Sequence, residues 1–222
     1  AGAAGETTAA IVGAGGRAIA LRVDVTDAAS MQAAVDRAQS ELGEIGIVLN
    51  NVGAILNGYP TDIPMAEWQR IFDLNYFAVV RSNAIFLPEM EARGRGHIVN
   101  PASFAGLYPY AAGRIPYASA KAAVISMSEN LALLLEPKGI RVSCLIPGPT
   151  VTAILEGMTS WTPDLPMYAG GSETTLKMPE ELAVTLSDGM RDGRILIPAE
   201  DVAWEILRRH AQDPDAFIRA KI

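Results

Sequence analysis

The chain has 222 residues, 50% of them hydrophobic and 19% charged, which is enough for one large domain or two small ones and excludes disorder as the main state. Acidic residues outnumber basic residues by 25 to 18 and no basic run occurs, so we do not expect a nucleic-acid partner. The single cysteine, Cys144, and the lack of an apolar run near the ~20 residues of a membrane helix predict a cytoplasmic protein with no membrane anchor.

Strand-like and helical periodicities alternate along the chain, as in strands joined by crossover helices. The chain opens on a helical stretch, 1–12. Further helices are predicted over 28–42, 65–92 and 116–136. Short β-branched runs predict strands at 18–25, 45–50, 97–101, 140–146 and 194–198. The alternation predicts an α/β fold with a parallel sheet covered on both faces.

Two later segments have other patterns. Proline and glycine are frequent in the region from 152 to about 178, which we expect to be a loop region beside the substrate. The end of the chain, 199–222, carries an apolar stripe on a predicted helix. We expect that stripe to pack against a partner subunit in a homo-oligomer, a dimer or a tetramer.

Three side chains form the strongest candidate for a catalytic site. Tyr117 and Lys121 are four residues apart near the start of the predicted helix 116–136, so the ammonium can sit beside the phenol and favour the phenolate. Ser103 follows the strand at 97–101, at the end where parallel sheets place their ligands, and its hydroxyl can donate to a carbonyl oxygen. The plain alternatives are a solvated pair and a serine that only turns the chain.

In the order of its motifs the chain resembles the short-chain dehydrogenases and reductases. The matching segments are Asp24-Val25, Asn50-Asn51-Val52-Gly53, Asn75, Ser103, Tyr117 to Lys121, and Pro147-Gly148. The resemblance implies a Rossmann-type, doubly wound sheet and NAD or NADP as the cofactor.

The resemblance also implies roles for single residues. Tyr117 would be the general acid/base, Lys121 would lower its pKa and bind the nicotinamide ribose, and Ser103 would polarise the substrate oxygen. Asn75 would hold a water that connects Lys121 to solvent, although a buried polar residue inside a helix is the plain alternative. The cofactor would contact Asp24, Val25, Asn50, Gly53, Tyr117, Lys121, Pro147, Gly148 and Thr152.

An apolar substrate pocket is expected if the family's geometry applies. Its candidate residues are Tyr108, Tyr110, Ile154, Leu155, Met158, Trp161 and Met167. Contacts in the core or with another subunit are an equally open alternative for these side chains. His97 and His210 have no neighbouring Cys or His, so we expect no metal site.

The sequence departs from the family at its beginning. The family opens with a strand, a Gly-rich turn and a helix that holds the pyrophosphate, whereas Gly2 and Gly5 follow no strand and Gly13, Gly15 and Gly16 precede one. We therefore expect a single Rossmann-type domain over 1–222 that is N-terminally incomplete, lacking its first βαβ unit. These residues alone should bind NAD or NADP poorly.

Together these patterns predict an oxidoreductase that interconverts a small apolar secondary alcohol and a ketone by hydride transfer. Two alternatives stay open. One is a cofactor-free, non-catalytic Rossmann-like protein or subunit, which the missing segment suggests. The other is a lyase or epimerase that uses the same tyrosine.

Overall fold

The computed structural model describes residues 2–167 and 173–222. The chain divides into two compact units, Ala1–Gly46 and Ile47–Ile222. No helix in the described part of the chain is long and apolar enough to cross a membrane.

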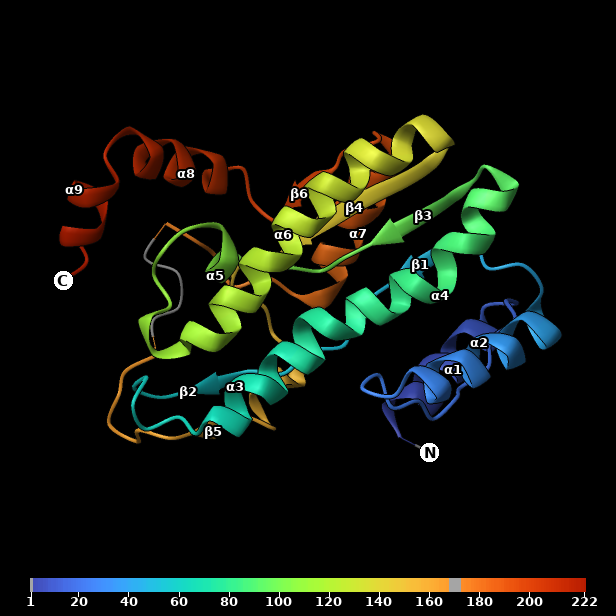
Figure 1. The fold of residues 1–222 in the computed structure, drawn as a ribbon, viewed down its shortest axis with the longest axis horizontal. Helices are drawn as coiled ribbons and strands as arrows, with labels where there is room; N and C mark the ends of the chain where they lie inside the picture. Colours follow the sequence, from blue (N-terminus) through green and yellow to red (C-terminus); the bar gives the residue numbers. More distant parts are fainter. Residues whose placement is uncertain (1, 168–172) are drawn as a thin grey trace. The chain divides into compact units, whose positions relative to one another are not determined.

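The first unit holds two helices, α1 (Ala3–Gly13) and α2 (Ala28–Leu42), shown in Figure 1. The side chain of Asp27 caps α2 by accepting a hydrogen bond from the backbone N–H of Ala29, and Gly43, with φ of 92°, ends the helix. Both helices follow the sequence pattern closely.

The strand predicted at 18–25 is wrong, because this segment has no strand pairing. Within the described part of the first unit no second extended segment runs beside it, so its backbone has no ladder to join. Two of its apolar side chains are exposed, Leu21 by 40% and Val23 by 37%. The segment ends where Asp24 turns the chain into α2, its carboxylate accepting hydrogen bonds from the backbone N–H and hydroxyl of Thr26.

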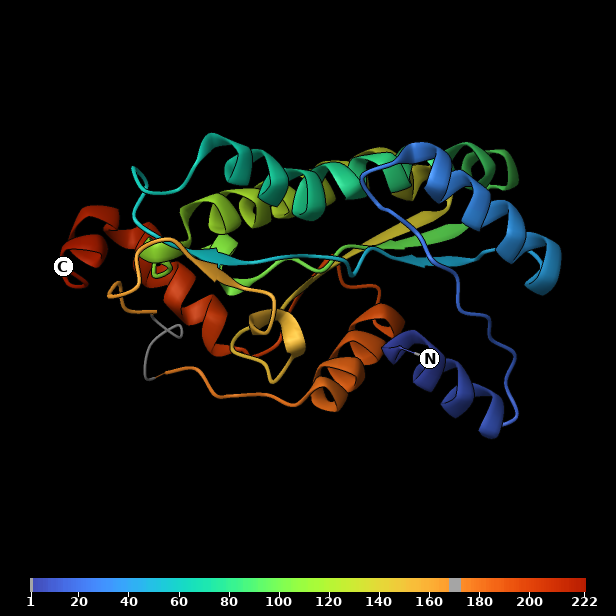
Figure 2. The same cartoon turned by 90° about the horizontal axis from the view of Figure 1, so that it is seen from below.

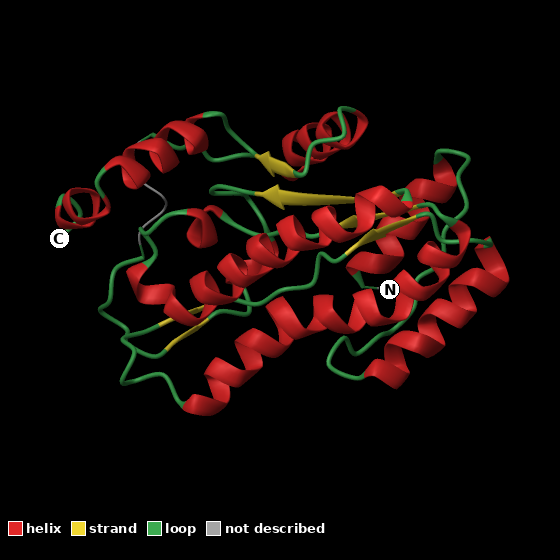
Figure 3. Cartoon of the chain, turned by 45° about the horizontal axis from the view of Figure 1, so that its top comes forward, coloured by secondary structure: helices red, strands yellow, loops and turns green. Residues whose placement is uncertain are grey.

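The second unit is built on a parallel sheet. Its strands are β1 (Ile47–Leu49), β3 (Gly96–Val99), β4 (Ile140–Ile146) and β6 (Leu196–Pro198), in the order β1-β3-β4-β6. Figure 3 shows the arrows of β4 and β6 pointing the same way. The register aligns Val48 with Ile98 and Ile98 with Val142, and all three side chains are buried. The four strands match four of the five predicted from the sequence.

Helices cover both faces of this sheet. A continuous helical run consists of α3 (Met65–Phe72), a π-helical turn (Asp73–Phe77) and α4 (Ala78–Arg93). Figure 2 shows α4 and α6 (Ile115–Leu135) on one face of the sheet and α7 (Pro179–Arg191) on the other. Gly189 of α7 allows a close approach to β6, since a Cβ there would lie 2.6 Å from Cδ1 of Ile197.

The remaining elements are short or lie towards the end of the chain. Strands β2 (Leu56–Asn57) and β5 (Thr159–Ser160) form a separate parallel pair. The short helix α5 (Phe104–Leu107) follows β3, and α8 (Val202–Gln212) and α9 (Pro214–Arg219) complete the chain. Phe104 and Ile206 join the same apolar core as Val124 of α6 and Ile146 of β4.

Candidate active site

A cavity of about 700 Å³ opens at the carboxyl ends of β1, β3 and β4, inside the second unit. Parallel sheets place their ligands at this edge. The polar side chains among its described lining residues are Asn51, Ser103, Tyr110, Arg114, Tyr117, Lys121, Thr150 and Thr152. Three of the four residues expected to be catalytic are therefore in one cavity.

Tyr117 and Ser103 form the polar centre of this cavity. Tyr117 lies in the first turn of α6 and is 7% exposed, and it lines the cavity together with Ser103. Ser103 is fixed as the N-cap of α5, where its Oγ accepts from the N–H of Ala105 at 3.2 Å. Burial raises the pKa of Tyr117 above its usual value, and the hydrogen bond from Ser103 and the charge of Arg114 offset this in part. At neutral pH the phenol is a proton donor.

Lys121 lies one turn further along α6. Its side chain is buried. Its Nζ donates to the carbonyl of Pro101 at 2.9 Å and lies 5.8 Å from the centre of the Tyr117 ring. Burial lowers the pKa of Lys121 to about 8. The expected role of Lys121 as the group that lowers the pKa of Tyr117 stays a prediction.

Asn75 lies beside this pair, in the π-helical turn, a feature often found at functional sites. Its Nδ2 donates to the carbonyls of Ala54 and Ile71, both at 2.9 Å, while its buried Oδ1 has no partner among the described residues. A Cβ on Gly53 would lie 2.8 Å from this Oδ1 and 3.8 Å from Nζ of Lys121. The glycine therefore keeps a small polar gap between Asn75 and Lys121, suited to a water or a ligand.

The structure places some of the residues expected to bind the cofactor in the cavity and others outside its lining. Lining the cavity are Gly53, Tyr117, Lys121, Pro147, Gly148 and Thr152. Asn50 is not among the lining residues, because its Nδ2 donates to Oδ1 of Asn100 at 2.9 Å, while Asn51 lines the cavity. Asp24 and Val25 belong to the first unit.

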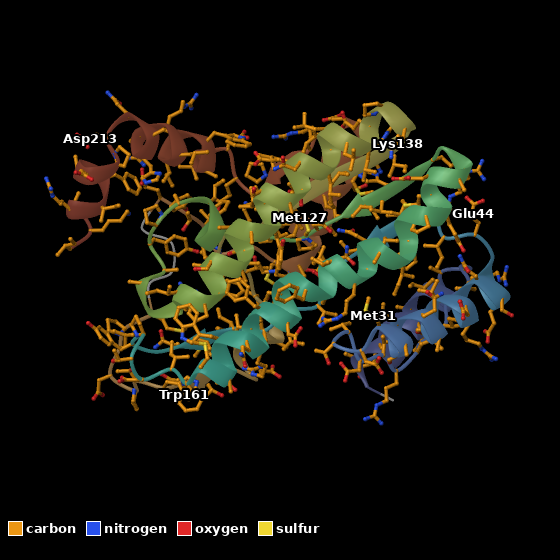
Figure 4. The ribbon with its side chains drawn as sticks, in the orientation of Figure 1. Met31, Glu44, Met127, Lys138, Trp161 and Asp213 are labelled. Atoms are coloured by element: carbon orange, nitrogen blue, oxygen red, sulfur yellow. The ribbon has the colours of Figure 1, made fainter. Side chains whose placement is uncertain are left out.

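Some of the residues expected to contact the substrate line the cavity and others do not. The cavity is lined by Tyr110, Ile154, Leu155 and Met167. Tyr108 is instead buried beside Phe104, and Met158 packs on the apolar cluster around Ile55. The backbone N–H of Trp161 donates to the carbonyl of Asn57 at 2.7 Å, where β2 and β5 pair (Figure 4).

Sequence reasoning missed two parts of the lining. One is the apolar face of α7, with Leu182 and Leu186. The other is Arg114, the last residue before α6. The only signal for Arg114 is its place three residues before Tyr117, which on its own says nothing about where its side chain points.

The described part of the chain has no cluster of three or more His, Cys, Asp or Glu side chains able to hold a metal ion. The sequence and the fold match those of a known family. The model of the short chain dehydrogenase family matches residues 2–163, and the chain belongs to that family.

Individual relatives agree with this assignment. The chain is 33% identical to the 7alpha-hydroxysteroid dehydrogenase of Escherichia coli K12, over 76% of this chain and 66% of the relative. It is 36% identical to a ketoacyl reductase of Nostoc, over 64% of this chain and 50% of the relative. The matches span between half and two thirds of the length of these curated relatives.

Among solved structures, a short-chain dehydrogenase from Sphingobium yanoikuyae in complex with NADPH superimposes with a TM-score of 0.75. It is 26% identical, and the match covers 96% of this chain and 81% of the other. The doubly wound Rossmann-type fold is confirmed.

Proposed function

We propose that the full-length protein is an NAD(P)-dependent oxidoreductase that interconverts a secondary alcohol and a ketone. The observation that carries this proposal is that the buried Tyr117 lines one cavity together with Ser103 and Lys121, at the carboxyl edge of a parallel sheet. A neutral phenol and a hydroxyl that meet at one point can share the oxygen atom of a carbonyl substrate.

The residues around the cavity fit a nicotinamide dinucleotide. Gly53 leaves open the space that a Cβ would fill between Asn75 and Lys121, and the Oδ1 of Asn75 has no partner among the described residues. Pro147, Gly148 and Thr152 line the same cavity and would lie along the nicotinamide half. When bound, the cofactor supplies or accepts the hydride. The NADPH complex of the Sphingobium relative supports this assignment without choosing between NAD and NADP.

The chain's own residues would handle the proton and the oxygen. In ketone reduction Tyr117 gives its phenolic proton to the carbonyl oxygen while Ser103 donates a hydrogen bond to that oxygen. Lys121, held by the carbonyl of Pro101, would bind the ribose hydroxyls. A water in the gap bordered by Asn75 and Gly53 would connect Lys121 to solvent.

The raised pKa of Tyr117 favours one direction of the proposed reaction at neutral pH. A phenol that stays protonated at neutral pH is ready to donate, which favours reduction of a carbonyl there. Oxidation of an alcohol needs the phenolate and should speed up as the pH rises. The reductases and dehydrogenases among the relatives show that the family's members are named for both directions.

The test is an assay of the full-length protein with NADH and NADPH and a panel of ketones. We expect loss of nicotinamide absorbance matched by formation of one alcohol per cofactor consumed. A folded protein that consumes neither cofactor with any ketone would favour the non-catalytic alternative. Conversion of a substrate with no net consumption of cofactor would favour a lyase or epimerase.

A further inference from the structure

Glu200 carries a carboxylate next to the cavity that has no role in the reaction described above. It follows β6, at the carboxyl end of the sheet. The N–H of the preceding residue, Ala199, donates to the carbonyl of Ile146 on β4 at 3.0 Å. The carbonyl of Glu200 accepts from the N–H of Ala203 on α8 at 3.1 Å. The half-buried side chain therefore starts from backbone that is held on both sides.

The carboxylate of Glu200 is hydrogen-bonded to Thr175. The backbone N–H of Thr175 donates to Oε1 at 3.1 Å and to Oε2 at 3.2 Å, and its hydroxyl donates to Oε2 at 2.8 Å. Oε1 also lies against the cavity lining, since a Cβ on Gly148 would be 3.5 Å from it. Hydrogen bonds to an ionised acceptor are stronger than those between neutral groups. Glu200 therefore ties Thr175 to the end of the sheet.

Thr175 belongs to a segment, 173–177, that forms part of the cavity wall. Leu176 of this segment lines the cavity. The backbone of Lys177 makes two hydrogen bonds with the segment 149–151, of 2.9 and 3.0 Å, and the first two residues of 149–151 line the cavity as well. The 173–177 segment is therefore held at two places, by a carboxylate at Thr175 and by backbone at Lys177.

Leu176 differs from most apolar side chains because it is largely in solvent. It is 67% exposed although it lines the cavity, so an apolar ligand that covers it gains free energy. Helix α7 begins just after the segment and adds Leu182 and Leu186 to the same lining. The tie at Thr175 thus holds an exposed apolar group at a place where a substrate can cover it.

We propose that Glu200 is a positioning residue for the oxidoreductase, which holds Thr175, and through it Leu176, against an apolar chain of the ketone. This inference rests on the proposed function and adds where the apolar part of the substrate lies. Glu200 itself is not among the described residues that line the cavity, so it acts through Leu176 and not on the reacting atoms. Because proton transfer stays with Tyr117, loss of Glu200 should raise KM and leave kcat nearly unchanged.

The first test measures the segment itself and does not depend on turnover. Hydrogen exchange is followed by mass spectrometry of peptides that contain Thr175, in the cofactor-free full-length protein and in Glu200→Ala. We expect the N–H of Thr175 to exchange at least about tenfold faster in Glu200→Ala, because it loses its acceptor. The matched control is Glu129→Ala, the same substitution at an exposed glutamate of α6 outside the described cavity lining. Equal exchange in Glu200→Ala and the unchanged protein would overturn the proposal.

The second test uses two methyl ketones that differ in chain length, 2-butanone and 2-octanone, reduced with NADPH and NADH. The readout is the ratio of kcat/KM for 2-octanone to that for 2-butanone. We expect this ratio to fall at least about tenfold in Glu200→Ala, the loss of contact with roughly two methylene groups, through a higher KM for 2-octanone. Leu176→Ala should show the same loss, and the double variant no more than Leu176→Ala, because both changes remove one contact. Glu129→Ala should keep the ratio.

Thr175 offers a pair of variants that leave the carboxylate in place. Thr175→Val removes the hydroxyl that donates to Oε2 of Glu200 at 2.8 Å, and Thr175→Ser keeps it. We expect the ratio for the two ketones to fall further in Thr175→Val than in Thr175→Ser. If Glu200→Ala does not fold, this pair decides in its place, and equal ratios in the two variants would overturn the role of Glu200.

The outcomes separate this inference from the proposed function. An unchanged ratio in Glu200→Ala, or an equal fall in kcat for both ketones, overturns the positioning role. A double variant that loses as much as both single variants together overturns the route through Leu176. Reduction of other ketones but not of 2-octanone by the unchanged protein overturns it as well. Absence of reduction with every ketone refutes the oxidoreductase, while hydrogen exchange still decides whether Glu200 holds the segment.

Discussion

At the scale of single residues, the most unusual group is the buried cation of Lys121. It is 6% exposed, and its ammonium donates a hydrogen bond of 2.9 Å to the carbonyl of Pro101. Burial disfavours the charged form, which is why its pKa falls to about 8. Keeping this cation buried therefore lowers the stability of the folded protein at neutral pH.

This gives a prediction with a definite sign. The pKa of Lys121 is about 8 in the folded protein and 10.5 in the ordinary case, so between these values the unfolded chain binds more protons and stability rises with pH. Lys121→Met lacks this contribution. At pH ~7 we expect the unfolding free energy of Lys121→Met to exceed that of the unchanged protein. This difference should shrink by about 2–3 kcal/mol between pH ~7 and ~10, because only the unchanged protein gains stability over that range.

Urea unfolding of the cofactor-free full-length protein at the two pH values measures this difference. Lys138→Met is the matched control, since Lys138 is 45% exposed and pairs with Glu91 at the surface. If the difference in unfolding free energy between Lys121→Met and the unchanged protein is the same at both pH values, Lys121 titrates as an ordinary surface lysine.

How far the site could be predicted from sequence also depends on single residues. Tyr117, Lys121 and Ser103 were found because helical spacing and the end of a strand fix their positions. Arg114 was not found, because the direction of its side chain depends on a contact with Tyr110 across a loop. The amide of Asn50 donates to Asn100, which follows the neighbouring strand β3, and no local pattern in the sequence encodes this contact.

At the scale of elements, the pairing of β2 with β5 holds the segment around β5, residues 153–167, in place. Asn57 is buried, and its Nδ2 donates to the carbonyl of Leu165 at 3.0 Å. The N–H of Gly58 donates to the carbonyl of Gly113 at 2.8 Å, next to the start of α6. A Cβ on Gly113 would lie 2.3 Å from Oδ1 of Asn57 and 3.1 Å from Leu165.

Gly113→Ala should therefore push Asn57 away and loosen the segment around β5. We expect a loss of about 1–3 kcal/mol in stability, the usual effect of overpacking, and faster proteolysis within residues 153–167. Gly157→Ala is the control in the same segment, because a Cβ there meets nothing within 4 Å. Equal proteolysis and equal thermal stability of the two variants would show that this contact does not hold the segment.

The elements also show what a sequence pattern can and cannot reveal. The helix at 28–42 and the strand at 140–146 have the predicted bounds, since a clear cap marks the first and a mostly apolar run from Ile140 to Ile146 marks the second. Helix α7 was missed, because its start is a capping box formed by Glu181 on the backbone of Met178, and methionine is not a usual capping residue. The false strand at 18–25 shows that β-branched content is insufficient without a partner strand.

At the scale of the whole molecule, we propose that both units belong to one Rossmann-type domain. Helices α1 and α2 of the first unit have no fully buried residue, so this unit has no core to hold it together by itself. It should fold only together with the rest of the protein. The homo-oligomer expected from the sequence remains a prediction.

Two optical signals test this proposal. The chain's tryptophans, Trp68, Trp161 and Trp204, all lie in the second unit, so fluorescence reports on that unit, whereas far-ultraviolet circular dichroism reports on the helices of both. In urea, the two signals of the full-length protein should follow one transition. A separate loss of helix before the change in fluorescence would show that the first unit unfolds independently.

The measurement that tests the central claim most directly is the rate of carbonyl reduction by Tyr117→Phe in the full-length protein. Removing the phenolic proton donor should lower kcat by about 10²–10⁴-fold, with the protein still folded and its affinity for the cofactor within a few fold. Tyr59→Phe, at a tyrosine that is 57% exposed and outside the cavity lining, should keep the full rate. If Tyr117→Phe retains most of its rate, the tyrosine does not transfer the proton and the mechanism is wrong.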